Sequence, residues 1–100
     1  MRFRYSETDD ALYIEVRVGR PEKQVQLDPG TVVDIDVEGR LIGIEVISPD
    51  AGWPAEEILS RFSVDPDDAA YIRGLEAKSF AFSRARVSST AALQVIDRTA

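Results

Sequence analysis

The sequence predicts an α+β fold in which an N-terminal antiparallel β-meander of about five strands is packed on one face by two C-terminal helices. In the first half of the chain, apolar and polar side chains alternate over several short segments, as in strands that are buried on one side. Gly and Pro residues separate those segments, as turns require. Beyond residue 54 the apolar side chains recur at helical spacing instead.

The expected strands cover residues 2–5, 11–18, 24–28, 31–37 and 40–47. Their alternation defines one apolar inner face, which we expect to pack against the helices. The residues predicted to lie on this face are Phe3, Leu12, Ile14, Val16, Val18, Val25, Leu27, Val33, Ile35, Val37, Ile42, Ile44 and Val46.

Two acidic residues, Asp9 and Asp10, stand directly before the second expected strand. We interpret them as a turn, because Asp side chains accept hydrogen bonds from nearby backbone N–H groups. The alternative is a catalytic pair, which needs two carboxylates that converge in a pocket. Adjacent residues at the entry to a strand point in different directions, and this favours the turn.

The last two expected strands have the clearest pattern, and their pattern defines a register. If residues 38–39 form a two-residue hairpin loop, Ile35 faces Ile42 and Val33 faces Ile44. Apolar side chains then meet on one face, and a shift of one residue would break the match. Gly43 lies within this hairpin, where we expect it to leave room opposite Asp34 or to permit a bend.

Two helices are expected over residues 55–62 and 66–78. Pro54 suits the first turn of one helix, and Asp65 followed by Pro66 suits the start of the other. The residues predicted to pack on the sheet are Ile58, Phe62, Ile72 and Leu75. The pair also has the spacing of a helix-turn-helix, but the second helix opens with several aspartates, which would repel DNA phosphates.

Trp53 stands at the junction between the expected sheet and helices, where we predict that it closes the edge of the core. A binding anchor is the alternative. Residues 79–100 form an extension with two competing interpretations. Alternation over residues 80–87 is typical of a strand, in the same chain or exchanged with a second copy, whereas residues 88–97 could form a short helix capped by Ser88 or Ser89.

We expect one domain over residues 1–100, made of a β-sheet region (1–50), a helical region (51–78) and the C-terminal extension (79–100). Composition restricts its chemistry. The chain has no Cys and no His, so thiolate and imidazole catalysis are excluded, and we expect neither a cofactor nor a metal. No apolar run is long enough for a signal peptide or a membrane span, and the expectation is a cytoplasmic protein.

The net charge of the chain indicates which partners it would attract. The net charge is −6, from 12 Lys and Arg against 18 Asp and Glu, so nucleic acid is an unfavourable partner and a basic protein or a cation is a better one. A homodimer is a further option. Strand alternation puts Tyr13, Glu15, Asp34, Asp36 and Glu45 on the outer face of the sheet, together with Arg17 and Gly43. The first five are the candidates for binding, and four of them are acidic.

Three interpretations of that face remain open. The first is a solvated acidic surface, and the second is a docking surface for a basic protein. The third is a site for Ca²⁺ or Mg²⁺, or a carboxylate-dependent catalytic site. A second candidate for partner binding is the alternating aromatic and basic segment of the extension, which contains Phe80, Phe82, Arg84 and Arg86.

The first fifty residues also carry a longer pattern, Y-x-x-x-x-D-A-L-Y-I from Tyr5 and, after a gap, G-T-V-V-D-I-D-x-x-G-R-L-I-G-I-E-V from Gly30. This pattern resembles the small bacterial and phage family catalogued as domain of unknown function 2283. The residues that carry the resemblance are Tyr5, Asp10, Ala11, Leu12, Tyr13, Ile14, Gly30, Val33, Asp34, Asp36, Gly39, Gly43, Ile44 and Glu45.

The resemblance implies an antiparallel sheet backed by helix, and it implies no established enzyme activity. Some members of this family are encoded beside genes for small toxin-like proteins. For those members, this position implies a role as candidate antitoxins. Together, charge and resemblance lead us to expect a non-catalytic interaction protein that binds a basic partner. The alternative is a metal-binding or enzymatic module that uses the carboxylates of the outer face.

Overall fold

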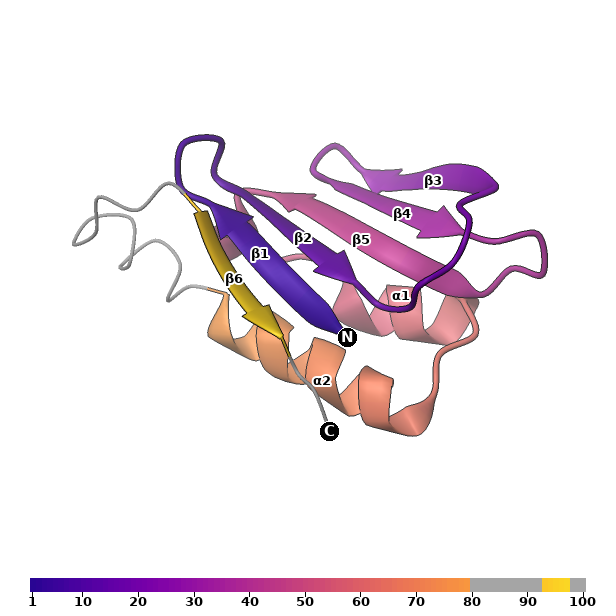
Figure 1. Cartoon of the computed structure of the whole chain (residues 1–100). Helices are drawn as coiled ribbons and strands as arrows, with labels where there is room; N and C mark the ends of the chain where they lie inside the picture. Colours follow the sequence, from indigo (N-terminus) through magenta and orange to yellow (C-terminus); the bar gives the residue numbers. More distant parts are fainter. Residues whose placement is uncertain (80–92, 98–100) are drawn as a thin grey trace.

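A computed structural model describes residues 1–79 and 93–97, which fold as one antiparallel sheet with two α-helices on one of its faces (Figure 1). The strands are β1 (Arg2–Ser6), β2 (Ala11–Glu15), β3 (Lys23–Asp28), β4 (Thr31–Ile35), β5 (Leu41–Ile47) and β6 (Leu93–Asp97). A 3₁₀ turn η1 (Pro49–Ala51) leads to the helices α1 (Ala55–Arg61) and α2 (Pro66–Lys78). The predicted α+β fold, with an antiparallel sheet followed by two helices, is confirmed.

The strand order is β3-β4-β5-β2-β1-β6. Consecutive strands are neighbours within β1–β2 and within β3–β4–β5. The connection from β2 to β3 crosses to the far edge of the sheet, so β2 pairs with β5. The last strand, β6, pairs with the open edge of β1.

Alternation along the strands builds the core. Leu12, Ile14, Val33 and Ile44 have no measurable exposure, because their side chains share the face that the helices cover. Ile58 of α1 and Ile72 of α2 are equally buried, as expected for the apolar stripe of each helix. Three other members of the predicted inner face, Val25, Leu27 and Ile35, are partly buried against this core, as is Phe62, which was predicted to pack on the sheet.

The hairpin between β4 and β5 has the predicted Val33–Ile44 pair but not the predicted Ile35–Ile42 pair. A bulge shifts the register, and Ile35 is paired with Leu41 instead. Both Leu41 and Ile42 are buried as a result. On the other side of β5, the backbone carbonyl of Ile42 accepts hydrogen bonds from the N–H groups of both Val16 and Arg17, which follow β2.

Two residues predicted on the inner face, Val18 and Val37, are in fact 92% and 80% exposed. Both follow strands that end early, β2 at Glu15 and β4 at Ile35. Strand β4 ends because Asp36 forms a turn. Its Oδ1 accepts hydrogen bonds of 2.9 Å from the backbone N–H groups of Glu38 and Arg40, and its Oδ2 accepts one of 2.8 Å from the Arg40 guanidinium.

Asp9 and Asp10 form the predicted turn between β1 and β2. Asp10 has a positive φ of 49°, a backbone conformation that Asp tolerates better than most residues. Its Oδ1 accepts a hydrogen bond of 2.6 Å from the hydroxyl of Tyr5, a side chain that is 1% exposed. Asp9 lies at hydrogen-bond distance from Ser6. The two carboxylates therefore have different partners and do not converge.

The helices begin near their predicted positions. Asp65 occupies the N-cap of α2, but its side chain makes no capping hydrogen bond and instead lies 3.9 Å from the Arg17 guanidinium. The Arg73 guanidinium of α2 donates hydrogen bonds of 2.7 and 3.3 Å to the two carboxylate oxygens of Glu56 in α1. Within the described residues, no helix is long and apolar enough to cross a membrane.

Trp53 closes the edge of the core as predicted, with 7% of its surface exposed. Its indole Nε1–H donates a hydrogen bond of 2.8 Å to Oγ of Ser79, which is 1% exposed and donates in turn to the backbone carbonyl of Leu75. This pair joins the segment after η1 to the end of α2.

Residues 93–97 are a strand rather than the second half of the helix that the sequence suggested. The reason is the open edge of β1, whose unpaired backbone groups are satisfied when β6 pairs with it in antiparallel register. The predicted strand over residues 80–87, and Ser88 and Ser89, lie outside the described residues.

We predict that Ser79→Ala lowers the free energy of unfolding by about 1–3 kcal/mol, because it leaves the buried indole N–H of Trp53 without an acceptor. Denaturant unfolding followed by the fluorescence of this single tryptophan measures the loss. Ser60→Ala is the matched control: Ser60 also bonds a helical carbonyl, that of Glu57, but it is exposed, and its loss is expected to stay within about 0.5 kcal/mol. Equal losses in the two variants would contradict the assignment.

The outer face of the sheet as candidate functional site

The two helices cover one face of the sheet (Figure 1). Strand pairing places four of the sequence-predicted site residues on the opposite face, namely Tyr13, Glu15, Asp34 and Glu45. We call this surface the outer face. Cross-strand pairing arranges the charged side chains of this face in two rows that run from β1 through β2 and β5 to β4. One row is Arg4, Tyr13, Glu45 and Val32, and the next row is Arg2, Glu15, Gly43 and Asp34.

Of the residues predicted for partner binding, the structure brings together Tyr13, Glu15, Asp34 and Glu45 on this face. Asp36 lies apart from them, because its carboxylate is committed to the β4–β5 turn and is only 10% exposed. The pKa of Asp36 is lowered: partial burial acts to raise it, but the hydrogen bonds from Arg40 and Glu38 and the charge of Arg40 outweigh that effect. The candidates Phe80, Phe82, Arg84 and Arg86 lie outside the described residues.

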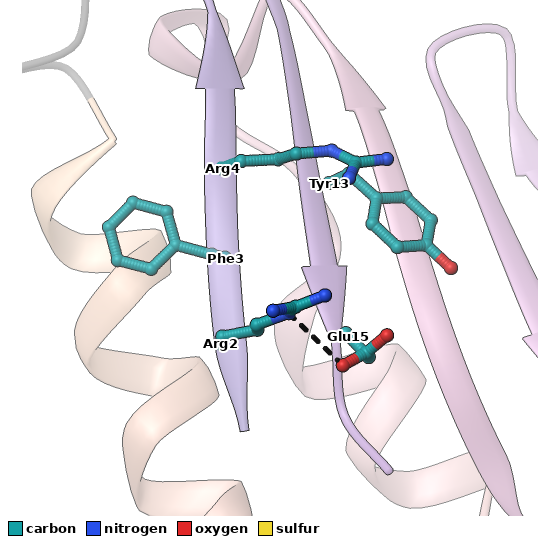
Figure 2. Close-up of a pocket in the computed structure, with 5 residues that line it drawn as sticks. All are labelled: Arg2, Phe3, Arg4, Tyr13 and Glu15. Atoms are coloured by element: carbon teal, nitrogen blue, oxygen red, sulfur yellow. Dashed lines mark ion pairs between the residues drawn. The ribbon is translucent and has the colours of Figure 1, made fainter. Parts of the chain in front are cut away.

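Sequence analysis missed two residues of the face, Arg2 and Arg4. Strand alternation opposite Phe3 was the available signal, but only the pairing of β1 with β2 shows that the arginines share a surface with the acids. Figure 2 shows both arginines on the side of Tyr13 and Glu15, while Phe3 points the other way. With Phe3, these four residues line an open hollow of about 330 Å³.

The charges on the outer face are therefore mixed and unevenly distributed. Arg2 and Arg4 of β1 form its basic side, and Glu45 of β5 with Asp34 of β4 form its acidic side. Between them, the Arg2 Nε lies 3.2 Å from a carboxylate oxygen of Glu15, with both side chains partly exposed. The sequence-based prediction emphasised the acids of this face, whereas strand pairing gives the face two oppositely charged sides.

Tyr13 occupies the centre of the face. The Arg4 guanidinium carbon lies 5.3 Å from the centroid of its ring, a cation–π distance (Figure 2). Its hydroxyl lies 3.5 Å from Oδ2 of Asp34, at the outer limit for a hydrogen bond. Partial burial raises the pKa of Tyr13, and the negative charges of Asp34 and Glu15 raise it further, while Arg4 acts in the opposite direction. The phenol is therefore neutral at physiological pH and is poorly suited to act as a base.

Gly43 explains how the ring of Tyr13 can lie across strand β5. A Cβ built on Gly43 would lie 2.5 Å from the Tyr13 hydroxyl, 3.0 Å from Cζ and 3.3 Å from the carbonyl oxygen of Ile14. The prediction that this glycine leaves room opposite Asp34 agrees with this contact, since Asp34 is the residue paired with Gly43. The ring takes the space that a side chain would fill and reaches Asp34 across β5.

The carboxylates of the face do not form a metal cage. In the segments 1–79 and 93–97, no group of three or more His, Cys, Asp or Glu residues converges so as to hold a metal ion. Glu15 faces Arg2, Asp34 faces Tyr13, and Glu45 lies on the strand between them. Divergent strand side chains of this kind suit contacts with a broad surface better than the coordination of one atom.

Comparison with known protein families gives a match to the N-terminal half of the chain. Residues 2–48 match the family described as "Protein of unknown function (DUF2283)", which agrees with the resemblance of the N-terminal half and leaves the helices and the C-terminal strand beyond the matched segment. No curated protein and no solved structure matches the chain.

The contact between Gly43 and Tyr13 leads to a prediction about stability. Gly43→Ala is expected to lower the free energy of unfolding by about 1–3 kcal/mol, because the new methyl group overlaps the tyrosine ring. In a Tyr13→Ala background the same substitution should cost at least about 1 kcal/mol less, since that overlap is gone. Denaturant unfolding of the four proteins measures the coupling. The same cost in both backgrounds would show that the ring does not lie over Gly43.

The raised pKa of Tyr13 predicts how stability depends on pH. A raised pKa in the folded state means that stability is complete below the ordinary phenol pKa of about 10 and is lost as the pH rises through the folded value. We expect the wild-type chain to lose more stability at alkaline pH than Tyr13→Phe, which cannot ionise. Near-ultraviolet absorbance should show one late-titrating phenol that the variant lacks; identical alkaline stability profiles would contradict this account.

Proposed function

We propose that this chain is a non-catalytic interaction protein that binds a basic protein partner through the outer face, as an antitoxin-like protein would. The observation that carries the proposal is that the helices occupy only one face of the sheet. The other face presents Glu45, an exposed carboxylate with no ion pair among the described residues, beside Asp34 and an aromatic ring.

Two further features support a basic partner. The net charge of −6 would attract such a partner over long range and speed their encounter. Tyr13 adds an amphipathic, rigid contact at the centre of the face, of the kind enriched in protein interfaces. The basic side formed by Arg2 and Arg4 would confine contact to Glu45, Asp34 and the ring between the two sides, and so would orient the partner.

The alternative function, a carboxylate-dependent metal or catalytic module, has less support because the carboxylates of the outer face diverge. Melting temperature in the presence of Mg²⁺, Ca²⁺ or Mn²⁺ distinguishes the two, since an ion that binds the folded state raises it. The interaction proposal expects no rise, and a rise lost in Glu45→Gln or Asp34→Asn would favour the metal module instead.

The interaction proposal predicts that the immobilised chain retains basic proteins from a lysate of its source cells at low salt and releases them at high salt. Glu45→Lys should reduce retention roughly ten-fold or more, because it places a repulsive charge at the centre of the contact. Glu57→Lys is the matched control, since it makes the same charge change on α1, in the helical layer. Mass spectrometry identifies the retained proteins.

Retention that is equal in the Glu45→Lys and Glu57→Lys variants would place the contact elsewhere on the molecule. If no basic protein is retained by the wild-type chain, the proposal of a basic partner fails.

A further inference from the structure

We propose that the outer face also binds a second copy of this chain, in a weak two-fold dimer in which the basic side of each copy lies over the acidic side of the other. The inference does not depend on the basic partner proposed above. It rests on the opposite charges of the two sides, which make the face complementary to itself.

The pairing of the strands fixes where these charges lie. Arg4 of β1 and Glu45 of β5 occupy the same row, on either side of Tyr13 in β2. Arg2 and Asp34 lie in the next row, with Glu15 and Gly43 between them. This row continues to Asp97 of β6, which is paired with Arg2, and to Gln24 of β3, which is paired with Asp34. Both rows therefore run from a positive charge on β1 to a negative charge on β5 or β4.

A two-fold axis that lies above β2 and parallel to it exchanges the positions of β1 and β5. When two such faces meet, Arg4 of one copy approaches Glu45 of the other, and the symmetry repeats this contact a second time. Face-to-face sheets pack about 10 Å apart, a distance that Arg and Glu side chains extended from opposite sheets can bridge. No other described face has this arrangement, because the inner face is covered by the helices.

The side chains of the face have the exposure that such a contact needs. Arg4 and Glu45 are exposed, and neither has an ion pair among the described residues. Tyr13 and Val32 are partly exposed in the same row, and Ile47, at the end of β5, is 48% exposed. An aromatic ring and two aliphatic side chains would give the contact an apolar component beside its charges.

The size of the face sets the expected strength. The six described strands, spaced about 4.8 Å apart and rising about 3.3 Å per residue, give a surface of roughly 24 Å across the strands and roughly 17–23 Å along them. The area of such a surface is smaller than the roughly 800 Å² that each partner contributes to a stable complex. The dimer should therefore form at high micromolar or higher concentrations, and a basic partner that uses Glu45 would compete with it.

The test is sedimentation equilibrium of the intact chain over a range of concentrations at low salt, with charge-reversed variants. Arg4→Glu and Glu45→Arg should each raise the dimer dissociation constant roughly ten-fold or more, since each reversal turns two attractive contacts into repulsive ones. An equimolar mixture of the two variants should associate as the wild type does. One variant then carries glutamate at both positions and the other carries arginine at both, so each symmetric contact again joins opposite charges.

Far-ultraviolet circular dichroism establishes that both variants are folded. The control is the double exchange Glu57→Arg with Arg61→Glu, which reverses an ion pair on α1 and should leave association unchanged. Failure of the mixture to associate would overturn the arrangement. A wild-type chain that stays monomeric at millimolar concentration and low salt would overturn the proposal itself, whatever the outcome of the partner experiment.

Discussion

The structure depends on a sheet that is covered on one side only. Alternating strands put Leu12, Ile14, Val33 and Ile44 against Ile58 and Ile72 of the helices, and these side chains are fully excluded from solvent. Two helices are sufficient to bury these side chains, because they cover one face of the sheet. The opposite face stays in contact with solvent. The same period of two that buries the core therefore also assembles the polar surface, and any slip in register would mix the two faces.

Within the polar surface, Tyr13 and Gly43 act as one unit. The missing side chain at Gly43 gives the ring a place to lie, and the ring brings a hydroxyl of β2 to Asp34 of β4, across the intervening strand. Arg4 covers the ring from β1. Three strands, β1, β2 and β4, are thus connected through side chains that lie across β5, in addition to their backbone hydrogen bonds. Tyr13, Asp34 and Gly43, which lie in the matched segment 2–48, therefore have a structural role. This role is distinct from the binding role that we propose for the outer face.

Much of the fold could be predicted from periodicity, and the failures have local physical causes. The strands β1 to β5, both helices, the Asp9–Asp10 turn and the position of Trp53 followed from patterning and turn chemistry, whereas β6 did not. Val37 was wrongly predicted on the inner face. The Asp36 side chain accepts hydrogen bonds from two backbone N–H groups and so ends β4, and the alternation of apolar and polar residues cannot reveal this turn. The predicted Ile35–Ile42 pair failed because a bulge shifts the register after Asp34, so that Ile35 is paired with Leu41, and alternation alone cannot reveal a bulge.

The candidate site was predictable only in part. Alternation identified the acids of the outer face, but the basic side depends on which strand pairs with β2, and that is a long-range property of the topology. The measurement that most directly tests the outer face as the binding surface is a nuclear magnetic resonance concentration series of the intact chain. We expect the backbone amides of β1, β2 and β5 to shift with concentration and those of α1 and α2 to stay constant. Shifts confined to the helices, or to the β3 edge, would contradict the account.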